Sequence, residues 1–257
     1  MGFAAAWLDL RAPADERARD DALVEKAVAF AGPRAHLLDL GCGTGAMVRA
    51  FAAKGAQNPH WYLLDNDSAL LDLAQKSHPG ADVILQNLKD LDAIPLGQMR
   101  MVTASALFDL VSEHWAMELV ARLARYGIAL YATLSYDGVM RWAPSDPLDS
   151  EITRRFNTHQ LGDKGFGPAM GPQAGPRLVA LLRQAGYTVE QARSAWRLGP
   201  DDAALQQVLI SGIARAAQED GLAKSETEGW TKRRIAMLKA AHAEIGHVDL
   251  LALPGGG

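Results

Sequence analysis

Three glycines at alternate positions mark the part of this chain that is best suited to hold a ligand. An apolar run over residues 37–40 leads into Gly41, Gly43 and Gly45, and a segment with helical spacing begins at Ala46. Glycine has no Cβ, so a ligand can lie directly against the backbone of such a turn. The free N–H groups at the start of the following helix favour negatively charged or electron-rich ligand atoms. The pattern predicts a binding turn between a strand and a helix.

Acidic residues end a second apolar run, about 20 residues further along the chain. Asp65 closes the run over residues 60–64 and is followed by Asn66 and Asp67. In nucleotide-binding α/β proteins an acid at this spacing accepts hydrogen bonds from ribose hydroxyls. Asp65 is better placed for this role because it ends the run, whereas Asp67 is positioned to cap the helix that follows. The alternative is that both acids are turn residues.

The glycine spacing fits two kinds of cofactor site. Gly41, Gly43 and Ala46 satisfy the G-x-G-x-x-G/A dinucleotide fingerprint. Asp39, two residues before the first glycine, and Gly45, at the third alternate position, instead resemble motif I (hh-D-h-G-x-G-x-G) of the class I S-adenosylmethionine (SAM) methyltransferases. The second acid and the Leu-x-x-Ala helix after it are also similar to this family.

The resemblance covers about residues 35–198 and 246–253, and it implies which residues would hold SAM. In the family, residues just past the third strand flank adenine, which here gives Asn87 a polar contact and Leu88 an apolar one. Many members carry an acid where this chain has Asn87. The cofactor residues implied by the resemblance are Asp39, Gly41, Cys42, Gly43, Gly45, Asp65, Asn66, Asn87, Leu88 and Ser105.

In this family the methyl donor and acceptor meet at the end of the fourth strand. The sulfonium methyl of SAM is already electrophilic, so a base is needed only if the acceptor must lose a proton. Four residues are candidates for that base, and the sequence does not choose among them: Asp109, His114, Tyr136 and His159. The chain lacks the Asn/Asp-Pro-Pro-Tyr/Phe tetrapeptide, which disfavours the enzymes that methylate the amino group of adenine.

Strand signals that alternate with helix signals position these residues. The alternation predicts a doubly wound, mostly parallel sheet, which binds ligands outside the carboxyl edge of its strands. The glycine turn, Asp65, Asn87 and residues 105–109 all fall at that edge. The resemblance implies a Rossmann-like α/β fold in three αβα layers, with seven strands of which the last is antiparallel.

The N-terminal segment predicts one helix before the sheet. Pro13, with acids after it, indicates a helix start, and the apolar spacing continues to about Ala31. Residues 1–12 are interpreted as irregular, and the polar side of the helix is expected to face solvent. The alternative is that Arg11 or Arg17 folds over the ligand site, as N-terminal helices do in the resembled family.

Two insertions interrupt the alternation in what we expect to be a single domain, residues 1–257. The first, at about 137–175, is rich in glycine and proline and contains a loop at 163–168 that could touch a ligand. The second, at about 200–245, contains two predicted helices. The first of these helices has an apolar stripe of Leu205, Val208, Leu209 and Ile213, and Ser225 with Glu228 forms a capping-box pattern near the start of the second. The insertions are interpreted as a substrate cap; the alternative for the second is a dimer interface.

Composition limits the remaining functions. The chain has 257 residues, of which 49% are hydrophobic, and a net charge of −4. No apolar run approaches the roughly 18 residues of a membrane span, and no leader pattern begins the chain. The single cysteine, Cys42, fits a reducing, cytoplasmic location. A missing basic tail argues against nucleic acid as a partner. We expect no metal, no membrane partner, and a monomer or homodimer.

Together these features predict a SAM-dependent methyltransferase that acts on a small-molecule acceptor. Two alternatives stay open at this level: a noncatalytic SAM-binding module that acts through a protein partner, and an NAD(P)-dependent oxidoreductase. The identity of the acceptor and of its methylated atom is not encoded in any pattern of the sequence.

Overall fold

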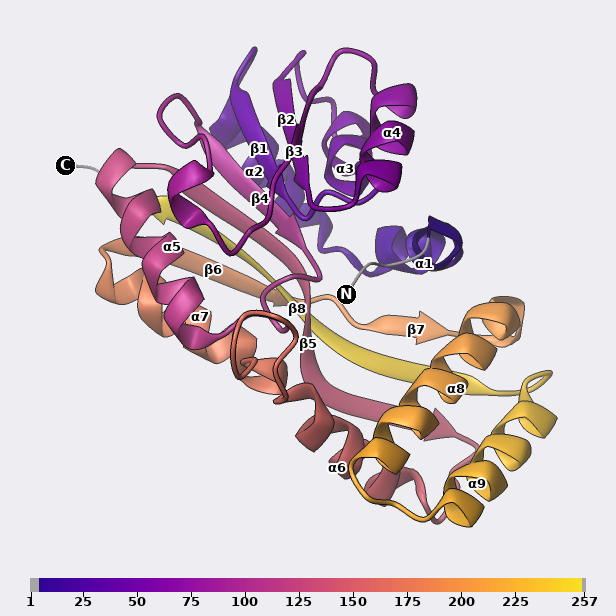
Figure 1. The fold of residues 1–257 in the computed structure, drawn as a ribbon. Coiled ribbons are helices and arrows are strands. Elements are labelled where there is room, and N and C mark those ends of the chain that lie inside the picture. The colour runs from indigo at the N-terminus through magenta and orange to yellow at the C-terminus, as the bar shows by residue number, and fades with distance from the viewer. Residues whose placement is uncertain (1–4, 256–257) are drawn as a thin grey trace.

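The computed structural model describes residues 5–255, which form a twisted sheet with helices on both faces (Figure 1). The sheet has eight strands in the order β3-β2-β1-β4-β5-β8-β6, with β7 paired to β8 outside this path. The strands are β1 (His36–Leu40), β2 (His60–Asp65), β3 (Asp82–Leu85), β4 (Met101–Ser105), β5 (Ala129–Ala143), β6 (Tyr187–Arg193), β7 (Trp196–Leu198) and β8 (His242–Pro254). The first five are parallel, and β8 is antiparallel to both β5 and β6. The predicted fold class is confirmed.

Nine α-helices occur within residues 5–255. They are α1 (Ala5–Ala18), α2 (Asp21–Ala31), α3 (Ala46–Ala53), α4 (Ser68–Ser77), α5 (Glu113–Tyr126), α6 (Asp149–Gln160), α7 (Ala174–Gln184), α8 (Ala203–Glu219) and α9 (Lys224–Met237). Short 3₁₀ turns lie at Leu91–Ala93, Gly171–Gln173 and Pro200–Asp202. In this part of the chain no helix is both long and apolar enough to cross a membrane.

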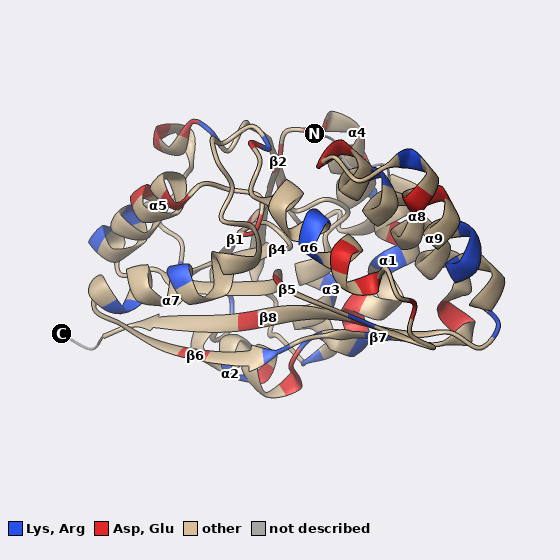
Figure 2. Ribbon diagram, turned by 90° about the horizontal axis from the view of Figure 1, so that it is seen from below, with Lys and Arg blue, Asp and Glu red and all other residues tan. Residues whose placement is uncertain are grey.

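The sheet separates two apolar cores, because successive side chains of a strand point to opposite faces. Leu38 and Leu40 pack with α5 and α7 on one face, whereas Leu37 packs with α2, α3 and α4 on the other. A parallel sheet covered on both faces needs apolar residues on both sides of its strands. Figure 2 agrees, since charged residues of both signs lie mostly on helices and loops while the strands are largely uncharged.

A third core lies in an extension of the sheet that the sequence did not predict. The insertions were expected at about 137–175 and 200–245, but β5 continues to Ala143 inside the first, and β8 begins at His242 inside the second. β7 joins the paired ends, with Trp196 opposite Ile245. Helices α6, α8 and α9 cover one side of this extension (Figure 1). Both insertions therefore belong to one packed unit that continues from the sheet.

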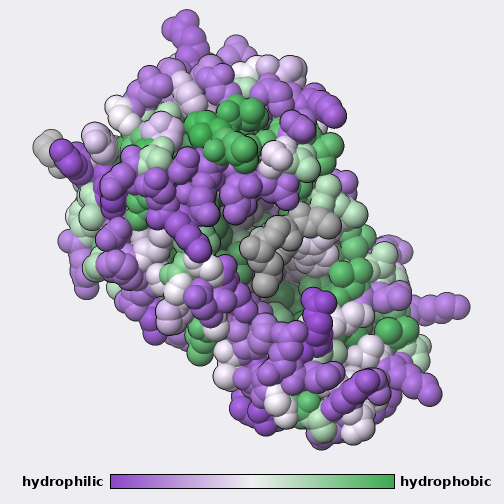
Figure 3. All heavy atoms as spheres, in the orientation of Figure 1, coloured by the Kyte–Doolittle hydropathy of each residue, from purple (hydrophilic) through white to green (hydrophobic). Residues whose placement is uncertain are grey.

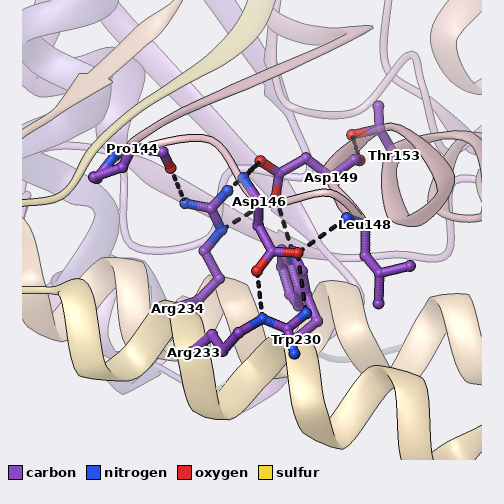
Figure 4. Close-up of polar contacts among 8 residues, drawn as sticks. All are labelled: Pro144, Asp146, Leu148, Asp149, Thr153, Trp230, Arg233 and Arg234. Carbon is purple, nitrogen blue, oxygen red and sulfur yellow. Dashed lines mark hydrogen bonds and ion pairs between the residues drawn. The ribbon is translucent and has the colours of Figure 1, made fainter.

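Two ion pairs, one of them buried, fasten the outer helix of this unit. Figure 4 shows Arg234 of α9, 1% exposed, pairing with Asp149 in the first turn of α6 and donating to the carbonyl of Pro144 at 2.6 Å. The neighbouring Arg233 pairs with Asp146 at 2.5 Å. Breaking a buried pair by removing one partner typically costs about 3–5 kcal/mol because a charge is left without compensation. The network fixes α9 against the start of α6.

The predicted N-terminal helix is wrong in its bounds. The chain forms two helices, α1 with Pro13 in its interior and α2 after a break at Asp20. The Asp20 side chain caps α2 by accepting from the N–H of Leu23 at 2.9 Å, and its own N–H donates to Asp249 at 3.0 Å. A contact from the far end of the chain therefore sets the break, so local patterns could not place it.

Two predictions for the second insertion are also corrected. Val208 is 47% exposed, while Gln206 is buried and donates to the carbonyl of Gly199 at 2.7 Å, so the buried face of α8 is rotated from the predicted stripe. Ser225 makes no cap, because α9 begins at Lys224 and Glu228 instead pairs with that lysine at 3.6 Å. The packing partners of these helices, rather than apolar spacing, decide which residues are covered.

Candidate active site

The glycine turn between β1 and α3 has the conformation that its sequence requires. Gly41, Gly43 and Gly45 all have positive φ, at 64°, 53° and 82°, a region that disfavours other residues. A Cβ on Gly43 would lie 2.9 Å from Leu8 of α1, and one on Gly45 would lie 2.6 Å from His78. The turn is therefore held between α1 and the chain that follows α4, and both approaches depend on the absence of a side chain.

Asp65 connects this turn to the end of β2. One carboxylate oxygen accepts from the N–H of Gly43 at 2.9 Å, and the other accepts from the N–H of Asp67 at 3.1 Å. Each oxygen keeps a further lone pair, and the side chain faces a cavity although the residue is only 9% exposed. Asp67 caps α4 by accepting from the N–H groups of Ala69 and Leu70, as predicted.

A cavity of two lobes lies along the carboxyl edge of β1, β2 and β4. The larger lobe is lined by residues 65–67, 87–88 and 105–107 together with Lys164 and Phe166. The smaller lobe is lined by α1 and by residues 41–44 and Arg49. The two lobes share Leu8, Arg11, Gly41, Gly43 and Ser105, so they lie side by side. Figure 3 shows this face of the molecule indented between the sheet and the extension.

Most of the residues predicted to hold a cofactor line this cavity. Those that do are Gly41, Cys42, Gly43, Asp65, Asn66, Asn87, Leu88 and Ser105. Gly45 stands behind the turn, where it makes room for His78. Asp39 is also behind the turn, 2% exposed, and accepts from the hydroxyl of Thr103 at 2.8 Å. Burial raises the pKa of Asp39 to about 7. These two residues support the turn from below and do not face the cavity.

The structure separates the four candidate bases. Asp109 follows the segment 105–107 that lines the cavity, and its Oδ1 is buried without a partner among the described residues. Burial raises the pKa of Asp109 to about 6. Tyr136 is buried close by and donates to Asn157 at 2.8 Å. His114 is exposed on α5 beside Glu118, and His159 contacts Glu219 of α8 at 2.8 Å, so neither lines the cavity.

Helix α1 supplies cavity residues that the sequence prediction assigned to solvent or to an irregular segment. Arg11 lines both lobes and makes two bonds to Asp15, at 2.8 and 3.1 Å, whereas Arg17 turns away to pair with Asp202. Asp15 also accepts from the indole N–H of Trp196 at 2.9 Å. The prediction that the polar side of this helix only faces solvent is wrong. The alternative, in which Arg11 or Arg17 folds over the ligand site, is correct for the position of Arg11 but not for that of Arg17.

Arg19, directly after the end of α1, also lines the cavity. It is 8% exposed, lines the smaller lobe, and its Nε and Nη2 atoms have no partner within residues 5–255. A buried guanidinium without a partner is costly, so its place beside a cavity indicates an anionic ligand. The sequence signal that could have placed Arg19 with Arg11 and Asp15 was their spacing, because residues four apart share one helical face.

The comparisons with known proteins agree with this geometry. Residues 37–127, which contain the glycine turn, Asp65 and Asn87, match the family model for the methyltransferase domain. Residues 37–127 form a methyltransferase domain. No curated protein matches its sequence.

Solved methyltransferase-like structures share its fold. A cyclopropane-fatty-acyl-phospholipid synthase-like protein from Lactobacillus casei has a TM-score of 0.58 at 14% identity, covering 98% of this chain and 94% of its own. YcgJ from Bacillus subtilis has a TM-score of 0.55 at 12% identity, covering 93% and 100%. The cyclopropane synthase MmaA2 from Mycobacterium tuberculosis has a TM-score of 0.50 at 16% identity, covering 91% and 87%. At identities this low, the likeness concerns the fold alone.

The cavity beside this domain fits SAM on two observations. A Cβ on Gly41 would lie 3.8 Å from Leu107 and 3.9 Å from Leu88, in the space that the larger lobe occupies. The unpartnered Arg19 calls for an anion at the opposite end. SAM has a nucleoside at one end and an amino-acid carboxylate at the other. Within the described residues no group of three His, Cys, Asp or Glu side chains is placed to hold a metal ion.

Proposed function

We propose that this enzyme transfers the methyl group of SAM to a small-molecule acceptor and binds SAM along the whole two-lobed cavity. The observation that carries this proposal is the adjacency of the two lobes, which meet at Gly41 and Gly43 and place Asp65 and Arg19 at opposite ends. The adenosine lies in the larger lobe and the methionine part in the smaller one.

The larger lobe supplies the contacts that adenosine needs. The Asp65 carboxylate, already fixed by the N–H groups of Gly43 and Asp67, accepts from the ribose hydroxyls with its remaining lone pairs. Leu88 covers the adenine ring, and the backbone carbonyl of Leu88 accepts from the indole of Trp115 at 2.7 Å, which holds this segment in place. Asn87 is close enough to the lobe to offer its amide to the base.

The smaller lobe receives the methionine carboxylate. Arg19 forms the ion pair, since its guanidinium is buried and has two donors to offer. Arg49 lies in the same lobe and donates to the carbonyl of Thr44 at 2.8 Å, which leaves the rest of its guanidinium for the ligand. An ion pair with a desolvated guanidinium gives both affinity and orientation to the amino-acid end.

SAM supplies an electrophilic methyl group when bound. The protein's part is to hold the acceptor in line with reacting atoms roughly 3–3.5 Å apart and to exclude water. Asp109 accepts the proton that the acceptor loses, through the Oδ1 atom that has no partner within residues 5–255. Because its pKa is raised to about 6, its carboxylate is ionised at neutral pH and is still basic enough to take a proton.

The first insertion forms the acceptor side of the site. Its loop contributes Lys164 and Phe166 to the cavity, next to Leu107 and Leu110. The second insertion supports this loop indirectly, since Arg155 of α6 donates to the carbonyl of Asp220 at 2.6 Å. Neither lobe is lined by residues of the second insertion, so acceptor specificity belongs to the first.

Two measurements test this function. Isothermal titration should show binding of SAM and of S-adenosylhomocysteine at micromolar concentrations and much weaker binding of NADH. Incubation with methyl-labelled SAM and a metabolite extract should then transfer label to compounds of low mass. Tight NADH binding without SAM binding would contradict the proposal, and SAM binding without transfer to any compound would indicate a binding module instead.

A further inference from the structure

Lys164 enters the cavity from a loop that is locked in place. The Asp163 carboxylate accepts from the N–H groups of Gly165 and Gly167, at 2.6 and 3.0 Å. The ring of Phe166 packs edge-on against Trp115, with ring centres 5.6 Å apart. A short β-bridge between Asp163 and Pro168 closes the loop. The position of Lys164 is therefore built into the loop and does not come from a free surface chain.

The ammonium group of Lys164 has no carboxylate partner among the described residues. It donates to the backbone carbonyl of His159 at 3.2 Å, and no acid lies within ion-pair distance of it. Glu219, the acid whose charge acts on it, is already bound to His159 at 2.8 Å. Burial lowers the pKa of Lys164, so its charge is held where water solvates it incompletely. A partly buried ammonium that pairs with no carboxylate of the described residues is available to an anion that enters the cavity.

The other cation on this side of the cavity is already neutralised. Arg11 forms a two-bond pair with Asp15, whereas Lys164 lies beside the apolar Leu107, Leu110 and Phe166. Arg19 and Arg49, which we assign to the methionine carboxylate, lie in the smaller lobe and not beside Lys164. Lys164 is therefore not needed for the methionine carboxylate, and we assign it to the second substrate.

We propose that the methyl acceptor is an amphipathic anion, whose carboxylate or phosphate pairs with Lys164 while its apolar part contacts Leu107, Leu110 and Phe166. The inference rests on the proposed function, since it names the class of its acceptor. It requires an acid group at one end of the acceptor and a nucleophilic atom at a distance that reaches the cofactor methyl.

Binding to the protein saturated with S-adenosylhomocysteine tests the acceptor class without a known acceptor. Titration with benzoate, octanoate and phenyl phosphate should show saturable binding, at least tenfold tighter than benzamide, octanamide and phenol. The carboxylates and the phosphate separate the two possible acid groups. Lys164→Met should abolish this preference for the anions, and Lys164→Arg should keep most of it. Lys89→Met, an exposed lysine next to the loop, is the matched control and should bind the anions as the wild type does.

The same variants separate the failure of this proposal from that of the proposed function. Equal binding of acids and amides, or unchanged anion binding in Lys164→Met, would overturn the anionic acceptor while leaving SAM binding intact. A tenfold loss of S-adenosylhomocysteine affinity in Lys164→Met would also overturn it, because the lysine would then serve the cofactor. Absence of cofactor binding in the wild type would instead contradict the proposed function.

With methyl-labelled SAM, the panel is extended to hydroxylated and amino-substituted forms of the same acids and their amides. We expect transfer to the acids, with kcat/KM at least tenfold above that of the matched amides. Lys164→Met should raise KM for the acids at least tenfold and leave kcat close to the wild-type value. Preference for the amides would refute the assignment.

Discussion

Replacement of Arg19 by methionine tests the assignment of the methionine carboxylate most directly. Methionine keeps an unbranched side chain of similar length and removes only the guanidinium. In the ligand-free protein two effects oppose each other, since a desolvated charge is removed but its attraction to Asp39 and Asp249 is lost. We therefore expect the ligand-free melting temperature to change little.

The loss should appear when the ligand binds. A hydrogen-bonded contact between charged groups contributes about 1.5–3 kcal/mol, which corresponds to roughly 10- to 150-fold in Kd. At a S-adenosylhomocysteine concentration of about 100 times the wild-type Kd, the ligand stabilises the wild type by about 2.7 kcal/mol. The same concentration should stabilise Arg19→Met by only about 0.3–1.3 kcal/mol. For a domain of this size each kcal/mol corresponds to roughly 2–4 °C in the melting temperature.

Two controls make the result specific. Arg17→Met removes an arginine only two residues away, in the last turn of α1, but its side chain is 53% exposed and pairs with Asp202, so ligand affinity should not change. 5′-Methylthioadenosine has the adenosine but no carboxylate, and it should bind wild type and Arg19→Met equally. Differential scanning fluorimetry and isothermal titration measure both. If Arg19→Met binds S-adenosylhomocysteine as tightly as Arg17→Met, or loses 5′-methylthioadenosine to the same extent, the reasoning is refuted.

Three further changes address the turn and the chemistry. Asp65→Ala should weaken SAM binding at least tenfold in titration calorimetry, because a charged hydrogen bond contributes about 1.5–3 kcal/mol. Asp67→Ala should mainly lower the stability of the fold, by the roughly 1 kcal/mol of a helix cap. Equal SAM affinities of the two variants would disprove the ribose role of Asp65. Asp39 keeps its proton to about pH 7 in the fold and releases it near 3.8 when unfolded, so it makes the fold less stable as the pH rises between these values. Asp39→Asn should therefore gain stability relative to wild type, on the order of 4 kcal/mol from pH 4 to pH 8 in urea unfolding, and a pH-independent difference would contradict the buried acid. If Asp109 is the base, wild-type kcat/KM should fall tenfold per pH unit below about pH 6. Asp109→Asn should lose roughly 10²–10⁴-fold activity and should no longer show this acidic fall. An unchanged pH profile in the variant would exclude Asp109 as the base.

The sequence by itself determined the sheet and most of the cofactor edge. Strand and helix periods are local, and the carboxyl ends of parallel strands meet at one edge whatever the loops do. Gly41, Asp65 and Asn87 therefore fall around one cavity although they come from different strands. The requirement for glycine at positive φ is equally local, which is why the turn could be predicted from its spacing.

Only the tertiary structure decided which of the residues near that edge face the ligand. Asp39 belongs to the motif, yet it lies beneath the turn against Thr103, because alternate residues of a strand point to opposite faces. Among the candidate bases, His114 and His159 are directed away by the orientation of their helices, and Asp109 stays near the site because its segment leaves β4 there.

The extension and α1 depended entirely on long-range contacts. The pairing of Trp196 with Ile245, and of the ends of β5 and β8, joins segments about 50 to 100 residues apart, and no local period reports such pairing. The chain that meets the cavity at α1 and just after it is largely polar, with Arg11 and Arg19 lining the cavity, so apolar spacing assigned it to solvent. A periodicity argument identifies which residues avoid water; it does not identify a polar face that is buried because a charged ligand belongs there.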